Sequence, residues 1–170
     1  MYKNPWKKIR LFFGKRKEIY NMVTNIPVNI KKLNDNAVIP TYGSEYAAGA
    51  DLYACIQEAI TIAPGETKLI PTGLAMELPI GYAGLIYARS GLASKKGLAP
   101  ANKVGVVDSD YRGEVMVALH NHSLVAASIE PSERIAQLVI TPYIAAVFNT
   151  VDSLDDTARG AGGFGSTGSH

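Results

Sequence analysis

The sequence predicts an all-β protein, and three observations support this fold class. From about residue 26 the chain is divided into short runs that are rich in Val, Ile, Leu and Tyr. Pro, Gly, Asn and Asp separate these runs, which is the pattern of short strands joined by turns. Only one short segment, residues 90–98, has a helical pattern, with Gly near each end. The even spacing of the short strand-like runs along the chain favours a sandwich, a barrel or a jelly roll.

The expected strands follow one another along the body of the chain. They are residues 28–33, 50–56, 59–64, 67–78, 82–88, 103–108, 113–121, 127–143 and 145–151. Residues 77–84 contain Pro79 and Gly81 and are typical of a turn between two strands. The polar residues 108–114 are interpreted as a hairpin connection between the strands that flank them.

The length of 170 residues indicates one domain, or one domain with a tail. No apolar run approaches the roughly 18 residues of a membrane span. The single cysteine, Cys55, excludes an internal disulfide and a zinc site built on cysteine. It suits a reducing compartment, so we expect a cytoplasmic protein. His120 and His122 lie in a strand-like run where alternate side chains face water, and we assign them no metal.

The first part of the chain differs in charge from the rest. Residues 1–32 hold nine Lys or Arg and one acidic residue, whereas the remainder holds eight basic and fourteen acidic residues. The apolar run at residues 11–13 is too short for a secretory signal. Three interpretations stay open for residues 1–25: an arm that contacts nucleic acid or another anionic surface, an amphipathic anchor, and a solvated extension. We expect no stable nucleic-acid binding by the body of the protein.

The C-terminal residues 160–165 read Gly-Ala-Gly-Gly-Phe-Gly, a formal match to the dinucleotide fingerprint G-x-G-x-x-G. That fingerprint requires a following helix and an acidic residue about 20 positions on, but only five residues follow it in this sequence. The Gly-Lys-Ser/Thr of a Walker A loop does not occur. Residues 153–170 lack apolar periodicity, so we expect a mobile arm there.

Three polar clusters interrupt the apolar pattern. Arg89 and Ser90 directly follow an apolar strand, residues 108–114 hold two Asp, a Tyr and an Arg, and residues 132–139 place charged groups in a strand-like run. Each cluster alone has an ordinary structural explanation as a helix cap, a turn or a buried polar pair. Their order along the chain is more informative than any one of them.

Taken in order, five segments resemble the five motifs of the trimeric dUTP diphosphatase (dUTPase) family. They are AGADLYA at 48–54, ARSGLASKKGL at 88–98, GVVDSDYRGEVMVALHN at 105–121, SERIAQLV at 132–139 and RGAGGFGSTG at 159–168. The resemblance implies a jelly-roll-like β-barrel that forms a homotrimer and hydrolyses dUTP to dUMP and pyrophosphate with Mg²⁺. In this family the sites lie between subunits, and the C-terminal arm of one subunit closes over a site formed by the others.

The resemblance also implies a division of the chain and a cellular role. Residues 1–25 form the basic extension, residues 26–153 the β-barrel domain, and residues 154–170 the Gly-rich closing arm. Enzymes of this family supply dUMP for dTMP synthesis and keep uracil out of DNA.

By the same resemblance, Asp108 is the general base for a water that attacks the α-phosphorus. A carboxylate within hydrogen-bond reach in a closed site can serve as such a base. Asp110 is expected to have a structural role in the same turn. Mg²⁺ prefers oxygen ligands and keeps waters, so we expect it on the substrate phosphates, with Asp51 contacting it through water.

The remaining expected contacts form three groups, at the phosphates, at the nucleoside and in the arm. They are Arg89, Ser90, Gly91 and Gln137 for the phosphates; Asn102, Val107 and Tyr111 for uracil and deoxyribose; and Arg159, Phe164, Gly165, Ser166 and Thr167 in the arm. Tyr111 is expected to pack on deoxyribose and leave no space for a 2′-hydroxyl, and Phe164 to stack on uracil. Arg134 is expected to brace the arm or the subunit interface.

Two other functions stay open at this point. A dCTP deaminase has a similar fold, but it acts on the base and requires a glutamate placed for chemistry at C4. A regulatory binding protein on the same fold is the second alternative. Two departures from the family pattern are Ala88, where many members have Pro, and Ser132, where Gly is frequent.

Overall fold

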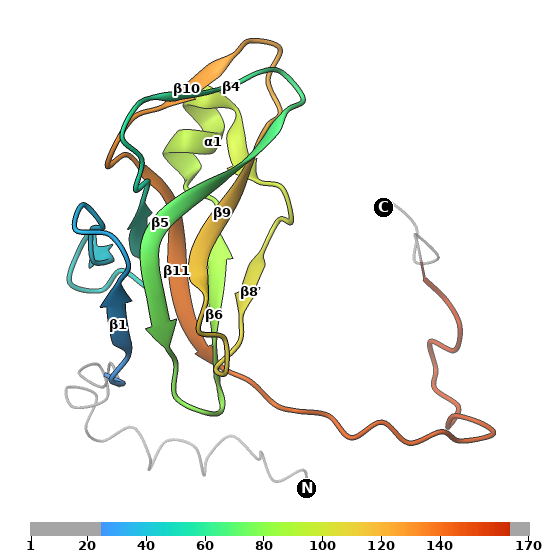
Figure 1. The fold of residues 1–170 in the computed structure, drawn as a ribbon. Helices are drawn as coiled ribbons and strands as arrows, with labels where there is room; N and C mark the ends of the chain where they lie inside the picture. The colour runs from blue at the N-terminus through green and yellow to red at the C-terminus, as the bar shows by residue number, and fades with distance from the viewer. Residues whose placement is uncertain (1–24, 164–170) are drawn as a thin grey trace, which may run out of the picture.

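The computed structural model describes residues 25–163, and its strands form two larger antiparallel sheets and one short antiparallel pair (Figure 1). The four-stranded sheet has the order β1 (Asn29–Lys32), β5 (Thr67–Glu77), β9 (Glu114–Asn121) and β7 (Leu98–Pro100). The five-stranded sheet has the order β2 (Thr41–Tyr42), β3 (Ala50–Tyr53), β11 (Arg134–Pro142), β6 (Tyr82–Tyr87) and β8 (Gly105–Val107).

The short pair, β4 (Ile60–Ile62) with β10 (Ala127–Ile129), lies at one end of the molecule near the helix α1 (Ser90–Lys96) (Figure 1). Strands that follow one another in sequence repeatedly lie in different sheets, as in a jelly roll. The predicted all-β, jelly-roll-like fold is therefore confirmed. No helix in the described part of the chain is long and apolar enough to cross a membrane.

The core lies between the sheets, and β9 shows most clearly how alternate side chains of a strand build it. In β9 the residues Val115, Val117 and Leu119 are buried, and the residues between them are only partly buried. Leu52 of β3 and Ile135 of β11 belong to the same buried cluster. Full burial of each such side chain contributes about 1.5–3 kcal/mol, so the alternation fixes which face of each strand points inward.

The long strand β5 bends at Gly73, where its pairing with β9 shifts register between Pro71 and Ala75. Gly73 has a φ of 68°, and a Cβ placed there would lie 2.7 Å from the Cys55 sulfur. Only glycine accepts both the backbone conformation and this close approach. Beyond this shift Ala75 pairs with Lys31 of β1 on one side and with Glu114 of β9 on the other.

Several expected element boundaries were wrong. Residues 145–151 form no strand, and residues 127–143 hold two strands, β10 and β11, separated by a turn at residues 130–133. The helix ends at Lys96, and Leu98 begins β7, which had been assigned to the helical segment. The very short strands β2 and β7 were not predicted.

The expected hairpin at residues 108–114 was also wrong. Its flanking strands belong to different sheets, because β8 pairs with β6 whereas β9 pairs with β5 and β7. The segment is thus a connection that crosses from one sheet to the other at the edge between them.

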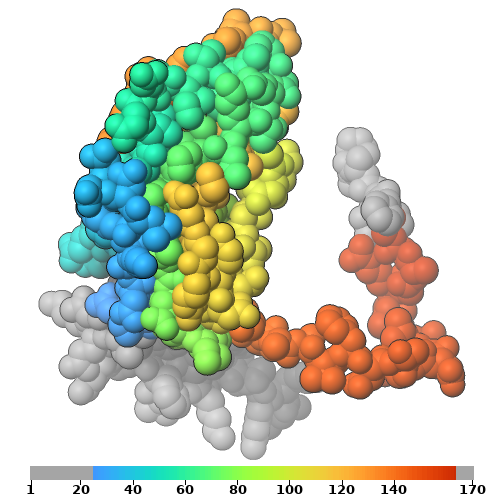
Figure 2. Space-filling view, in the orientation of Figure 1, coloured from blue at the N-terminus to red at the C-terminus, as the bar shows by residue number. Residues whose placement is uncertain are grey.

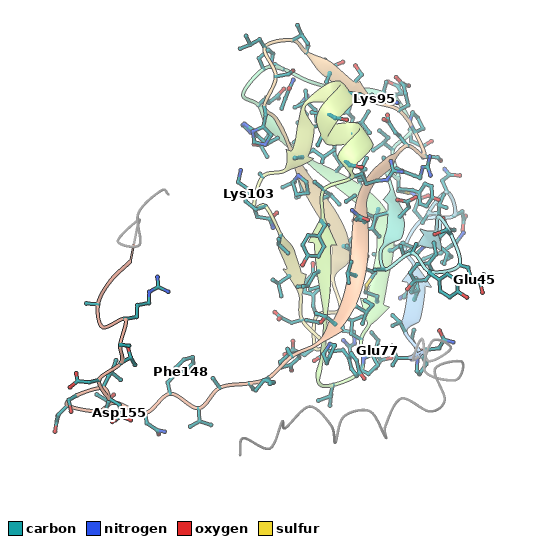
Figure 3. All side chains as sticks on the ribbon, turned by 180° about the vertical axis from the view of Figure 1, so that it is seen from behind. Glu45, Glu77, Lys95, Lys103, Phe148 and Asp155 are labelled. Carbon is teal, nitrogen blue, oxygen red and sulfur yellow. The ribbon has the colours of Figure 1, made fainter. Side chains whose placement is uncertain are left out.

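After Pro142 the chain leaves the body as an extended segment that reaches away from it (Figures 1 and 2). Phe148, which Figure 3 labels on this segment, is 93% exposed, and Ile144 is 95% exposed. Val147, Val151 and Leu154 are exposed as well. A run of exposed large apolar side chains is typical of a surface that another chain covers.

Candidate active site

One carboxylate, Asp51 of β3, holds two arginines at the end of the five-stranded sheet. Arg89 donates from Nε to Asp51 Oδ1 at 2.7 Å, and Arg134 donates from Nη1 to Asp51 Oδ2 at 3.2 Å. Asp51 is 9% exposed, so its charge requires such partners. The two guanidinium groups and one carboxylate together carry a net positive charge, which suits an anionic ligand.

The position of Arg89 follows from the end of β6 and the start of α1. Arg89 stands at the N-cap with extended backbone angles and makes no side-chain cap, which leaves its guanidinium free to reach Asp51. It also donates from Nη1 to the Arg134 carbonyl at 3.3 Å. Of the five N–H groups of an arginine, these two bonds use two, so the others are available to a ligand.

Gln137 lies beside this cluster, because β11 pairs it with Asp51 on one side and with Tyr87 on the other. Its side-chain amide donates to the Ala88 carbonyl at 2.8 Å. A Cβ on Gly49 would lie 2.7 Å from Gln137 Oε1, so a side chain there would displace the end of the Gln137 side chain. The structure therefore brings together Asp51, Arg89, Arg134 and Gln137, with Ser90 and Gly91 following at the start of α1.

A second group of expected residues lines a pocket of about 340 Å³ between β8 and the start of β9. Asn102, Val107, Asp108 and Tyr111 all line it, together with apolar residues such as Ile86. The Asp108 side chain is exposed, and Tyr111 donates from its hydroxyl to the Glu114 carbonyl at 3.0 Å. Polar groups that converge on a partly apolar pocket are typical of a small-molecule site.

Arg112 braces the loop that carries Asp108 and Tyr111. Its guanidinium donates to the Ser109 carbonyl at 2.7 Å, to the Tyr111 carbonyl at 3.0 Å, and to Glu77 of β5 at 3.2 Å. Within the described residues no hydrogen bond or ion pair involves the Asp110 side chain, which is exposed. The bracing role expected in this turn therefore falls to Arg112.

The pocket and the Asp51 cluster lie apart within one chain. Val107, the residue before Asp108, pairs with Gly84, which is five residues before Arg89. At about 3.3 Å per residue of strand, Val107 and Arg89 are separated by roughly 16 Å. Because β6 and β8 are antiparallel, the chain leaves β8 toward Asp108 in the direction away from Arg89. One chain alone does not bring these two groups together.

The expected contacts of the arm are partly outside the described residues. Arg159 is exposed, on the segment that extends away from the body, and its Nε donates to the Gly162 carbonyl at 2.8 Å. Phe164, Gly165, Ser166 and Thr167 fall in residues 164–170, which the structure does not describe. The basic residues 1–24 are likewise outside the description.

No three His, Cys, Asp or Glu side chains gather into a possible metal site in residues 25–163. Both Asp51 oxygens already accept from arginines, although a carboxylate oxygen can accept a further hydrogen bond. The donor set therefore fits a contact through water and not direct coordination of an ion.

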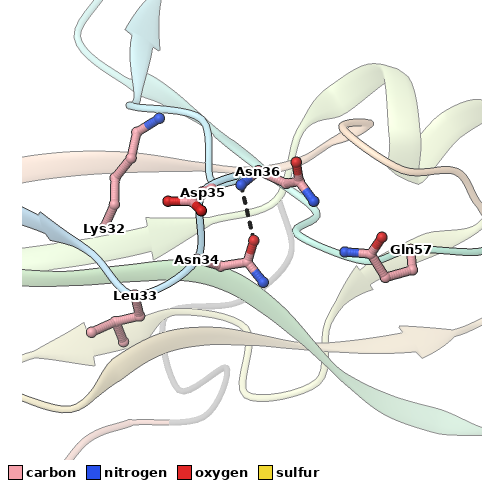
Figure 4. Close-up of a pocket in the computed structure, with 6 residues that line it drawn as sticks. All are labelled: Lys32, Leu33, Asn34, Asp35, Asn36 and Gln57. Atoms are coloured by element: carbon pink, nitrogen blue, oxygen red, sulfur yellow. Dashed lines mark hydrogen bonds between the residues drawn. The ribbon is translucent and has the colours of Figure 1, made fainter.

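A separate hollow of about 540 Å³ lies on the opposite flank of β5 from β9, and it contains none of the expected site residues. Figure 4 shows its lining, which consists of Lys32, Leu33, Asn34, Asp35, Asn36 and Gln57. The Asn34 side chain accepts from the Asn36 backbone N–H at 2.9 Å, so this hollow is mainly the concave side of a local turn.

Sequence reasoning missed the partners that hold the site residues in place. Arg134 contacts Asp51, and no sequence pattern indicated this pair, because 83 residues separate them. The pairs Arg112–Glu77 and Lys96–Glu133 are separated by 35 and 37 residues. The only available signal was that each pair has an acidic residue inside a predicted strand, which indicates a basic partner elsewhere without naming it.

Comparison with known proteins finds the same family over most of the chain. The family model for dUTPase matches residues 35–168. The deoxyuridine 5′-triphosphate nucleotidohydrolase of Nautilia profundicola is 54% identical over 141 residues, which cover 83% of this chain and 98% of the relative. That of Thiobacillus denitrificans is 53% identical over 131 residues, covering 76% and 90%.

Among solved structures, the dUTPase of Staphylococcus bacteriophage 80alpha, solved with dUPNHPP, has a similar fold. It superposes with a TM-score of 0.76 at 29% identity, over 85% of this chain and 99% of the phage protein.

The brace on Glu77 generates a prediction on pH. A hydrogen bond from Asn29, and next the charge of Arg112, lower the pKa of the Glu77 carboxyl below its ordinary value. These contacts therefore stabilise the fold above the ordinary pKa and lose this effect as the pH falls through the lowered pKa. Arg112→Gln should raise the Glu77 pKa part of the way back, since Asn29 stays. An NMR titration of the Glu77 carboxyl carbon measures this shift. Lys103→Gln is the control, and an unchanged Glu77 pKa in Arg112→Gln would contradict the brace.

Proposed function

The chain belongs to the dUTPase family, and from this premise we propose that it hydrolyses dUTP to dUMP and pyrophosphate at sites shared between the subunits of a homotrimer. The observation that carries the proposal is the presence of two complementary half-sites. A nucleoside-sized pocket holds Asp108 and Tyr111, and a positively charged cluster holds Arg89 and Arg134.

The first half-site supplies the base for the reaction. We assign to Asp108 the general-base role toward a water that attacks the α-phosphorus. Its carboxylate lines the pocket and is exposed, so a water can reach it in the open protein. Closing the site then removes bulk water and strengthens the hydrogen bond between that carboxylate and the attacking water.

The same pocket selects the nucleoside. Asn102 and the backbone through Val107 line its wall, where fixed donors and acceptors distinguish uracil from cytosine. A mismatched base would leave buried polar groups unpaired, which costs about 1–3 kcal/mol for each group. Tyr111, held by its bond to the Glu114 carbonyl, would pack on deoxyribose and exclude a 2′-hydroxyl.

The second half-site binds the triphosphate. Arg89 keeps free N–H groups while it is paired with Asp51, and Ser90 and Gly91 add a hydroxyl and backbone N–H groups beside it. Gln137 holds the Ala88 carbonyl and thereby fixes the residue before Arg89. Mg²⁺ carried on the phosphates would neutralise charge that builds up on them. Asp51 would contact the water molecules around that ion. Its carboxylate oxygens already accept from arginines, but a carboxylate oxygen can accept a further hydrogen bond.

The assembly follows from what one chain leaves incomplete. Val107, which precedes Asp108, and Arg89 are roughly 16 Å apart along the sheet, and the segment 143–163 extends from the body with exposed apolar side chains. A second copy that covers those side chains would also bring Arg89 of one subunit to Asp108 of another. The arm of residues 154–170 would then close over the shared site with Arg159, Phe164, Gly165, Ser166 and Thr167. In this scheme the barrel domain, expected at residues 26–153, has its last strand end at Pro142.

The direct test of the proposed function is a comparison of nucleotides. Pyrophosphate release from dUTP, dCTP, dTTP and UTP is measured in parallel, with and without Mg²⁺. We expect release from dUTP with Mg²⁺, and a kcat/KM for the other three lower by at least about 100-fold. Ammonia with dUTP as the product from dCTP would instead identify a deaminase. If none of the four nucleotides is cleaved, a regulatory binding protein on the same fold would be the remaining alternative.

The role of Asp108 is tested against its neighbour. Asp108→Asn and Asp110→Asn make the same change two residues apart on one exposed loop. We expect Asp108→Asn to lower kcat by about 100-fold or more, because general-base catalysis contributes on this order. Asp110→Asn should keep most of the activity. Equal losses in steady-state assays of the two variants would show that the assignment to Asp108 is wrong.

A further inference from the structure

Lys96, the last residue of α1, is held by an unusually complete set of bonds. Its ammonium donates to the Ser128 carbonyl at 2.7 Å and to the two oxygens of Glu133 at 2.7 and 2.9 Å. A lysine ammonium has three N–H groups, so every one of them is used. Both side chains are partly buried, with 35% of Lys96 and 22% of Glu133 exposed. This burial reduces the screening that weakens ion pairs on an open surface.

Glu133 is itself fixed, and it directly precedes a residue of the phosphate half-site. Its carboxylate accepts from the Glu130 backbone N–H at 2.9 Å, and its carbonyl accepts from the Ala54 N–H at 2.9 Å. The next residue, Arg134, pairs with Asp51. The Lys96–Glu133 pair thus joins the end of α1 to the start of β11.

The helix depends on polar contacts at its two ends. It has seven residues, and Leu92 is the only one of them that is buried. A single buried side chain gives a short helix little apolar anchorage. Arg89 fixes the start of the helix through Asp51 and the Arg134 carbonyl, and Lys96 fixes its end through Glu133. Both ends of α1 are therefore tied to residues 133 and 134.

We propose that Lys96 is a positioning residue for the phosphate half-site, acting through Glu133 to hold α1 so that Arg89 and Ser90 face the substrate phosphates. This inference rests on the proposed dUTP hydrolysis. Lys96 does not touch the substrate in this role. Its loss would let the helix shift, and a misplacement of about 1 Å near reacting groups can cost about 100-fold in rate.

The adjacent residue provides a matched control. Lys95 is in the same last turn of α1 and has the same charge, but it is exposed and makes no ion pair with any residue from 25 to 163 (Figure 3). Lys95→Met and Lys96→Met therefore remove the same charge from the same helix end. Only Lys96→Met removes the contact with Glu133.

The experiment measures kcat for dUTP and the inhibition constant of deoxyuridine, which has no phosphate, at a temperature where circular dichroism shows each variant folded. We expect Lys96→Met to lower kcat by about 10- to 100-fold and to change the deoxyuridine constant by less than about twofold. Lys95→Met should change neither value by more than about twofold. Lys96→Arg keeps the charge and the N–H donors that the Ser128 carbonyl and Glu133 accept from, so it should keep kcat within about fivefold of wild type.

Three results would overturn the inference. The first is a kcat of Lys96→Met within about twofold of an active wild type, and the second is an equal loss in Lys95→Met. The third applies if Lys96→Met does not fold: a folded Lys96→Arg whose kcat is lower than that of wild type by more than about tenfold. A wild-type enzyme that cleaves no dUTP would overturn the proposed function together with this inference, whereas the three results above leave the proposed function standing.

Discussion

The pairing of Asp51 with Arg89 and Arg134 is the interaction on which the proposed phosphate half-site depends. Burying one carboxylate is unfavourable unless it is paired, and here the compensation is two guanidinium groups from different elements. The carboxylate fixes both cations and leaves an excess of positive charge. The same residues that satisfy a buried charge thus prepare a surface for an anionic ligand, so stability and binding are linked in one cluster. The neighbouring Gln137 bond to the Ala88 carbonyl extends this order to the chain that leads into Arg89.

The topology of the sheets explains why the site is divided. The antiparallel pairing of β6 with β8 directs Asp108 away from Arg89, while the loop after β8 crosses to the other sheet. No rotation of side chains removes a separation that the register imposes. In the proposed mechanism a complete site requires a second chain, and the apolar segment after Pro142 has the exposed surface that such an association would bury. The proposal thus derives the divided site and the association of subunits from the same register.

The sequence was informative where local pattern decides the structure and silent where distant partners decide it. Strands such as β5 and β6 were predicted almost to the residue, because alternation and turn residues mark them. Residues 145–151 have the composition of a strand, but they pair with no strand among residues 25–163. The prediction of a hairpin at residues 108–114 was wrong for the same reason, since pairing between strands is a long-range property. Sequence reasoning named Asp51, Arg89 and Asp108 among the site residues. It did not identify Arg134 as a partner of Asp51.

Subunit complementation tests most directly whether the site is shared. Asp108→Asn and Arg89→Ala variants, each inactive alone, are unfolded together in equal amounts and refolded into mixed assemblies, with each variant refolded alone as the control. If a site takes Asp108 from one subunit and Arg89 from another, about one quarter of all sites are intact after random assembly, counting the trimers of a single variant, and dUTP cleavage returns to about that fraction of wild type. If both residues serve the same site from one chain, no intact site forms in any mixture. Mixed trimers without activity would contradict the account.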